Sequence, residues 1–67
     1  MTASELAAEI WGVGHKDSRS PGARIVRLVA RELFPEQAPG KGRAWRFTKG
    51  QASKIRRHRR VKTAFSA

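Results

Sequence analysis

The 67-residue sequence predicts a mostly α-helical domain of three helices, with a short glycine-rich loop before the third helix and a basic C-terminal extension. Helix-start signals precede three segments, and apolar residues recur at helical spacing within them. A stretch that alternates apolar and charged residues lies between the second and third segments. A chain of this length has room for one domain, which we place at residues 1–61; residues 62–67 are expected to be a disordered tail.

The first helix is expected over residues 3–11. Thr2 and Glu5 have the spacing of a capping box, in which each side chain accepts a hydrogen bond from the backbone N–H of the other residue. Apolar side chains then follow at a four-residue spacing, and a glycine ends the pattern. Residues 12–20 have no apolar period and are predicted to be a loop.

The second helix is expected over residues 20–34. Ser20 is a favoured N-cap, and Pro21 occupies the first helical position, where its missing N–H costs nothing. Pro35 ends the helix, because a proline disfavours helical backbone in the residue before it. The apolar residues of this segment share one face of the helix.

Three cations, Arg24, Arg27 and Arg31, fall on the opposite face of this second helix, within roughly 60° of one another at ~100° per residue. Amphipathic helices commonly carry charge on their outer face, so the spacing alone favours a ligand-binding role no more than a solvated one. No acid interrupts these three positions.

Residues 39–46 are predicted to form a basic loop that leads into a short strand. Trp45 and Phe47 would point into the core while Arg46 points outward, because side chains alternate along a strand. Base stacking by Trp45 is the alternative interpretation. The third helix is expected to start at Thr48, with a second capping box, and to fray into a basic extension by about residue 61.

Charge is segregated along the chain. Residues 1–36 hold five cations and five acids, whereas residues 37–67 hold ten cations and no acid, and the net charge is +10. This segregation favours a polyanionic partner. There is no cysteine, and neither a paired-carboxylate nor a phosphate-loop pattern is present. We therefore expect no metal, no cofactor and no enzymatic activity.

No apolar run approaches the ~20 residues of a membrane span, and the N-terminus does not begin with a basic segment typical of a secretory signal. The sequence therefore predicts a cytoplasmic, nucleoid-associated protein with no membrane partner.

The order of these elements resembles a winged helix-turn-helix. The first helix and turn of bacterial helix-turn-helix modules resemble SELAAEI followed by GV, and their recognition helix resembles SPGARIVRLVARELFPE. Small actinobacterial and actinophage DNA-binding proteins, related in layout to excisionases and to the DNA-binding heads of MerR-type regulators, have a tryptophan-containing loop and helix similar to PGKGRAWRFTKGQASKIRRH. The resemblance covers about residues 4–60. The segment WGVGHKDSRS is longer than the turn of the common module.

This resemblance implies that helix 20–34 lies in the major groove of double-stranded DNA and that a basic wing at 39–46 contacts the backbone or the adjacent minor groove. The protein would act as a small transcriptional regulator or an excisionase-like architectural factor, with its oligomeric state on DNA left open. The expected DNA-binding residues are Ser20, Arg24, Arg27, Arg31, Lys41, Arg43, Arg46, Arg56, Arg57, Arg59 and Arg60.

Two alternatives remain open at this point. Basic runs such as residues 56–60 bind RNA as readily as DNA, so an RNA- or ribosome-associated protein is one alternative. The other is a phage-type inhibitor of a host protein, in which Leu28, Phe34 and the basic face would form a protein interface.

Overall fold

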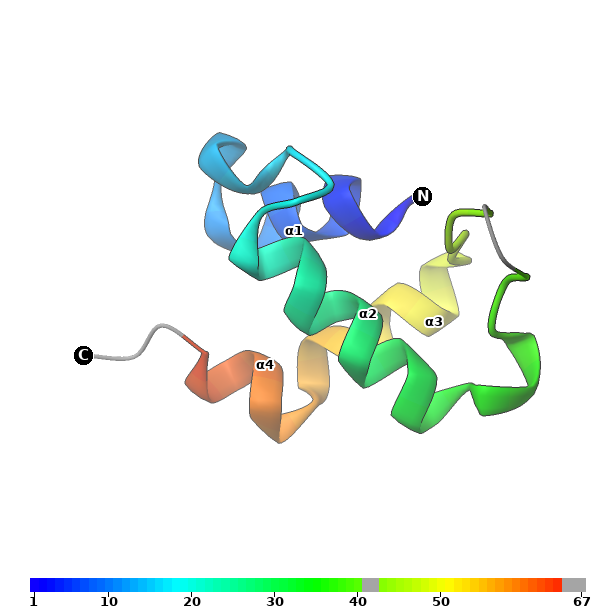
Figure 1. Ribbon diagram of the computed structural model, residues 1–67. Coiled ribbons are helices and arrows are strands. Elements are labelled where there is room, and N and C mark those ends of the chain that lie inside the picture. The colour runs from blue at the N-terminus through cyan, green and yellow to red at the C-terminus, as the bar shows by residue number, and fades with distance from the viewer. Residues whose placement is uncertain (41–42, 65–67) are drawn as a thin grey trace.

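The computed structural model describes residues 1–40 and 43–64 of the chain. Within these residues it has four α-helices and two 3-10 turns and no β-strand: α1 Ala3–Trp11, η1 Val13–His15, α2 Pro21–Leu33, η2 Pro35–Gln37, α3 Lys49–Arg57 and α4 Arg59–Thr63. In Figure 1, α2 runs through the middle of the view and crosses in front of α3, with α1 above it and α4 at the lower left. The mostly α-helical fold is confirmed, but the expected three helices are four.

The first three helices start at the caps that the sequence predicts. Thr2 Oγ1 accepts a hydrogen bond from the backbone N–H of Glu5 at 3.2 Å, and Glu5 Oε1 accepts one from the N–H of Thr2 at 3.3 Å. Thr48 and Gln51 form the same reciprocal pair before α3, at 3.2 and 3.0 Å. The hydroxyl of Ser20 accepts from the third residue of α2 at 3.2 Å. These bonds satisfy N–H groups that the helices themselves leave unpaired.

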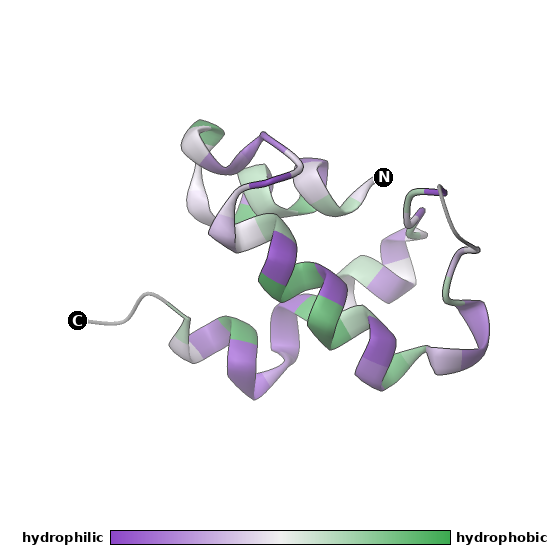
Figure 2. Ribbon diagram, in the orientation of Figure 1, coloured by the Kyte–Doolittle hydropathy of each residue, from purple (hydrophilic) through white to green (hydrophobic). Residues whose placement is uncertain are grey.

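The core is a single apolar cluster beneath α2. Its buried members come from every described helix and from the segment before α3: Ala3, Leu6, Ala7, Ala23, Val26, Val29, Ala30, Trp45, Phe47, Ala52, Ile55 and Val61. Figure 2 shows the apolar and polar bands that alternate along α2, which is the pattern of a helix with one buried face. The opposite face of α2 is therefore free of the core.

The predicted loop between α1 and α2 contains a 3-10 turn and a close packing contact. Gly12 ends α1 with a φ of 108°, a conformation that favours glycine. At the start of α2, a Cβ added to Gly22 would lie 2.6 Å from Nδ1 of His15 and 2.7 Å from a ring atom of Trp11. The Gly22 N–H donates to that same His15 nitrogen at 3.2 Å. Only glycine allows α2 to approach the end of α1 this closely.

The segment before α3 has the predicted alternation but is not a strand. Trp45 and Phe47 are each 6% exposed and their rings stack with centroids 5.6 Å apart, whereas Arg46 is exposed. Phe47 exchanges two backbone hydrogen bonds with Met1, of 2.7 and 3.2 Å, and this pair replaces the strand ladder that a wing would have. The placement of both rings in the core is confirmed.

The C-terminal extension differs from the expectation. α3 ends at Arg57, His58 has an extended backbone (φ −66°, ψ 137°), and the chain then turns into α4. Val61, at the position where fraying was expected to begin, is 4% exposed and belongs to the core. Lys62, expected in the disordered tail, lies in α4. Residues 65–67 of that expected tail lie outside the described residues.

Candidate nucleic-acid interface

The three arginines of α2 lie on its outer face, as the helical spacing predicts. Arg24 and Arg31 are exposed, and Arg27 is half-buried because its guanidinium donates a hydrogen bond to the carbonyl of Ser18 at 2.8 Å. We call these three residues the arginine row. They line a shallow hollow of about 190 Å³, together with Leu28 and Trp45. The row is thus one surface, and the loop before α2 holds its middle member.

A second hollow joins the arginine row to the segment before α3. Its volume is about 320 Å³, and its lining residues are Thr2, Ala3, Ser4, Ser18, Arg27, Arg43, Ala44 and Trp45. Arg27 and Trp45 line both hollows, so the two are adjacent. Arg43 therefore extends the row beyond α2, on a surface that it shares with Trp45. Lys41, the other expected wing cation, lies outside the described residues.

Arg46, another expected DNA-binding cation, is exposed. Its positive charge, like that of the N-terminal ammonium, contributes to lowering the pKa of Glu5 from its usual 4.5. Hydrogen bonding to the Glu5 carboxylate by the side chain and by the backbone N–H of Thr2 is the larger cause of the lowered pKa. Arg46 thus neighbours the start of α1 and lines neither of the two hollows.

Ser20, which is expected to contact DNA, is buried and forms the N-cap of α2. It is 7% exposed, and its hydroxyl donates to the carbonyl of His15 at 2.8 Å while accepting the N-cap hydrogen bond of α2. Both functions of the hydroxyl are therefore used within the protein. The capping role accounts for a serine at this position, and a contact between Ser20 and DNA stays a prediction.

Four arginines of the C-terminal basic run are expected to contact DNA, and they lie at different places on the surface of the structure. Arg56 forms an ion pair with Glu9 of α1 at 3.2 Å and lines a groove between α1 and α3 that shares no lining residue with the two hollows of the arginine row. Arg57, Arg59 and Arg60 are exposed. Arg59 and Arg60 border a third hollow beside Glu32, near the end of α2.

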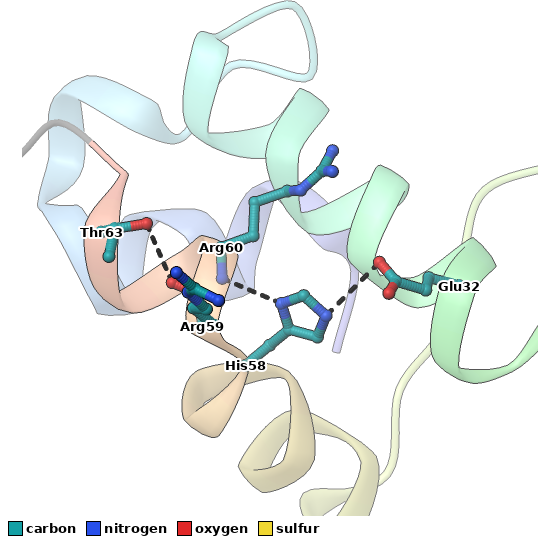
Figure 3. Close-up of polar contacts among 5 residues, drawn as sticks. All are labelled: Glu32, His58, Arg59, Arg60 and Thr63. Atoms are coloured by element: carbon teal, nitrogen blue, oxygen red, sulfur yellow. Dashed lines mark hydrogen bonds and ion pairs between the residues drawn. The ribbon is translucent and has the colours of Figure 1, made fainter.

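His58 is a residue whose role the sequence did not predict. Figure 3 shows its ring between α4 and α2: Nδ1 accepts a hydrogen bond from the backbone N–H of Arg60 at 3.0 Å, and Nε2 faces a carboxylate oxygen of Glu32 at 3.4 Å. The ring caps α4 and ties that helix to α2 in one contact. Sequence spacing gives no signal for this, because the partner carboxylate lies on another helix.

Two kinds of feature are absent from the described part of the chain. Among residues 1–40 and 43–64, no group of three or more metal-ligating side chains gathers in one place. None of the helices in those ranges has both the length and the apolar character to cross a bilayer. Comparisons with protein-family models, curated proteins and solved structures find no match. The surface itself is therefore the basis for any functional conclusion.

Proposed function

We propose that this protein binds double-stranded DNA, with α2 in the major groove and the segment 39–46 against the backbone or the adjacent minor groove. In this proposal it has the winged helix-turn-helix arrangement and serves as a small transcriptional regulator or an excisionase-like architectural factor, associated with the nucleoid. The observation that carries the proposal is the arginine row, on the exposed face of a helix whose other face is core. A helix of this kind fits the width of a major groove.

The positions of the other cations support the proposal. Arg43 continues the arginine row across the second hollow, where a wing would approach the duplex backbone. Arg59 and Arg60 border a hollow that also touches Glu32 of α2, close to the end of the row. Contacts from these positions would be to phosphates, which fix orientation without selecting a sequence. Arg56 is exposed but pairs with Glu9 in a different groove, so its expected contact with DNA stays a prediction.

Fluorescence anisotropy against a mixed-sequence duplex, the matching single strand and a hairpin RNA tests the choice of ligand. We expect the duplex to bind most tightly. If about 4–7 phosphates are contacted, the slope of log K against log[salt] on the duplex is about −4 to −6, at roughly −0.9 per contact. A slope shallower than about −2, or a preference for the RNA, contradicts the proposal.

Exposed arginines of the row test the role of α2 directly. On a site selected from a random duplex pool, Arg24→Ala and Arg31→Ala are each expected to weaken binding by about 1–3 kcal/mol, and by clearly less on unrelated duplex. Lys49→Ala is the matched control. It also removes one positive charge, but from the groove between α1 and α3. Equal losses for all three variants on both duplexes would show that α2 does not select sequence.

A further inference from the structure

Leu28 lies in the middle of the arginine row, where a charged or polar residue would be ordinary for an outer helix face. It is 47% exposed and lines the hollow of about 190 Å³ with the three arginines and Trp45. An exposed leucine alone needs no explanation. What distinguishes this one is its place, with a guanidinium one helical turn before it and another one turn after it.

The occupant of this hollow has to satisfy two requirements at once. It must leave three guanidiniums hydrated or hydrogen-bonded, since burying them unpaired is costly. It must also present a small apolar group to Leu28. The major groove of DNA meets both requirements, because guanine offers two acceptors to an arginine and thymine carries a C5-methyl group at the same edge. Uracil lacks this methyl group, and the major groove of an RNA helix is too deep and narrow for side chains to enter.

The dimensions agree with such a contact. Arg24 and Arg31 are seven residues apart on α2, which corresponds to about 10 Å along a helix axis at ~1.5 Å per residue. Base pairs repeat every ~3.4 Å along a duplex, so the row spans about three of them. Leu28 lies between its ends. A methyl group at Leu28 would thus belong to a base pair flanked by those that the two arginines reach.

We propose that Leu28 contacts the C5-methyl group of a thymine and thereby makes this protein distinguish thymine from uracil and cytosine at one position of its site. The inference rests on the proposed DNA binding and adds a named contact to it. The neighbouring arginines supply acceptor recognition and phosphate attraction, and the leucine supplies the apolar contact that arginine cannot make.

The test uses a duplex selected from a random pool, in which each thymine is replaced in turn by deoxyuridine, so that only one methyl group is removed. At one thymine we expect the replacement to weaken binding about three- to fivefold, the effect of one apolar methyl group, with little change at the others. Leu28→Ala is expected to weaken binding to the original duplex by a similar factor and to be indifferent to the same replacement.

Leu33→Ala is the matched control variant. Leu33 is also an exposed leucine of α2, at 38%, but it lines a hollow with Phe34, Pro35, Glu36 and Gln37 and lies outside the arginine row. This variant should keep the full response to deoxyuridine. Both variants are expected to be folded, because alanine is favourable on an exposed helix surface, and circular dichroism checks this.

The outcomes separate this inference from the proposed function. Sequence-selective duplex binding with no response to deoxyuridine at any position, or with the same response in Leu28→Ala, overturns the thymine contact and leaves DNA binding intact. A selected site without thymine does the same. Failure to bind duplex at all, or preference for a protein or RNA ligand, contradicts the proposed function and overturns the thymine contact with it.

Discussion

Residues 1–36 carry all five acids of the protein and as many cations, whereas residues 37–67 carry ten cations and no acid. Each half nevertheless begins a helix with the same device, a threonine cap and a reciprocal partner three residues later. In α1 that partner is Glu5, and in α3 it is Gln51. The amide performs the same capping function as the carboxylate. The basic half thus keeps its helix start without adding a negative charge that would oppose a polyanionic ligand.

The two halves also depend on each other. Glu9 pairs with Arg56, and Glu32 contacts His58, so two acids of the first half anchor residues of the second. Phe47 is hydrogen-bonded to Met1 through both backbone groups. The described part of residues 37–64 thus packs against residues 1–36 through buried apolar side chains and through these polar contacts. A strongly basic segment can therefore be ordered when its few apolar residues are buried in a core shared with the rest of the chain.

The largest expected loss of stability follows from removing Trp45, the largest buried apolar side chain of residues 37–67. Trp45→Ala is expected to destabilise the protein by about 3–5 kcal/mol, a large fraction of what a domain of this size has. The ring is buried against Phe47 and closes the floor of both hollows of the arginine row. Thermal and urea unfolding followed by circular dichroism measure the change. Trp45→Phe, which keeps a ring in place, should lose less than half as much.

An unchanged melting curve for Trp45→Ala would favour the base-stacking alternative. Stacking needs an open ring face, and the 6% exposure of Trp45 leaves little of one. Weaker binding to single strands in a fully stable variant is the result that would reinstate it.

The next largest effect concerns the part of the basic half that the sequence did not predict. Val61→Ala removes two methylene equivalents from the core and is expected to cost about 1.5–2.5 kcal/mol. If the chain instead frayed from residue 61, Val61→Ala would change the free energy of unfolding by no more than about 0.5 kcal/mol. Lys62→Ala is the control, because Lys62 is exposed and its replacement is expected to have an effect of that small size. Urea unfolding of the two variants therefore distinguishes an ordered α4 from a solvated tail.

The sequence allowed the helix starts, the apolar face of α2 and the burial of Trp45 and Phe47 to be predicted, because each depends on neighbours within a few positions. It did not allow α4 to be predicted. Val61 follows a run of cations, and its apolar partners come from distant parts of the chain. The turn at His58 between α3 and α4 is stabilised by the contact of His58 with Glu32. The two residues are far apart in the sequence, so no local pattern predicts this contact.

The same limit applies to the candidate site. The arginine row follows from helical spacing, and the structure exposes Arg24 and Arg31 and leaves Arg27 half-buried. Three other features depend on how the helices pack against one another: the continuation of the row to Arg43, the ion pair of Arg56 with Glu9 and the burial of Ser20. Whether a residue faces the ligand or the protein is therefore decided by tertiary contacts that a spacing rule does not contain.

A smaller effect is expected at the corner that joins the halves. His58→Ala removes the cap of α4 and the contact with Glu32, and should cost about 1 kcal/mol. His58→Asn separates the two contributions, because asparagine is a good N-cap but is too short to replace the imidazole contact with α2. We expect intermediate stability for His58→Asn in urea unfolding. Equal stability of both variants and the wild-type protein would mean that α4 is positioned by Val61 alone.

The smallest effect compares the two capping boxes through pH. In the folded protein the pKa of Glu5 lies below its usual 4.5, chiefly because its carboxylate accepts hydrogen bonds at Thr2. A group with a lowered pKa contributes stability that is fully present above the unfolded pKa and is lost as pH falls through the folded pKa. The box at Thr48 and Gln51 has no group that titrates there. Between pH 6 and pH 3, the melting temperature of Glu5→Gln is therefore expected to fall less than that of the wild-type protein.

Gln51→Glu is the reciprocal variant. Its melting temperature should fall more than that of the wild-type protein, because the substitution places a titrating carboxylate in the second box. If both variants lose stability in parallel with the wild-type protein, the hydrogen bonds of Glu5 with Thr2 add no stability that depends on pH, and the two boxes are equivalent over this pH range.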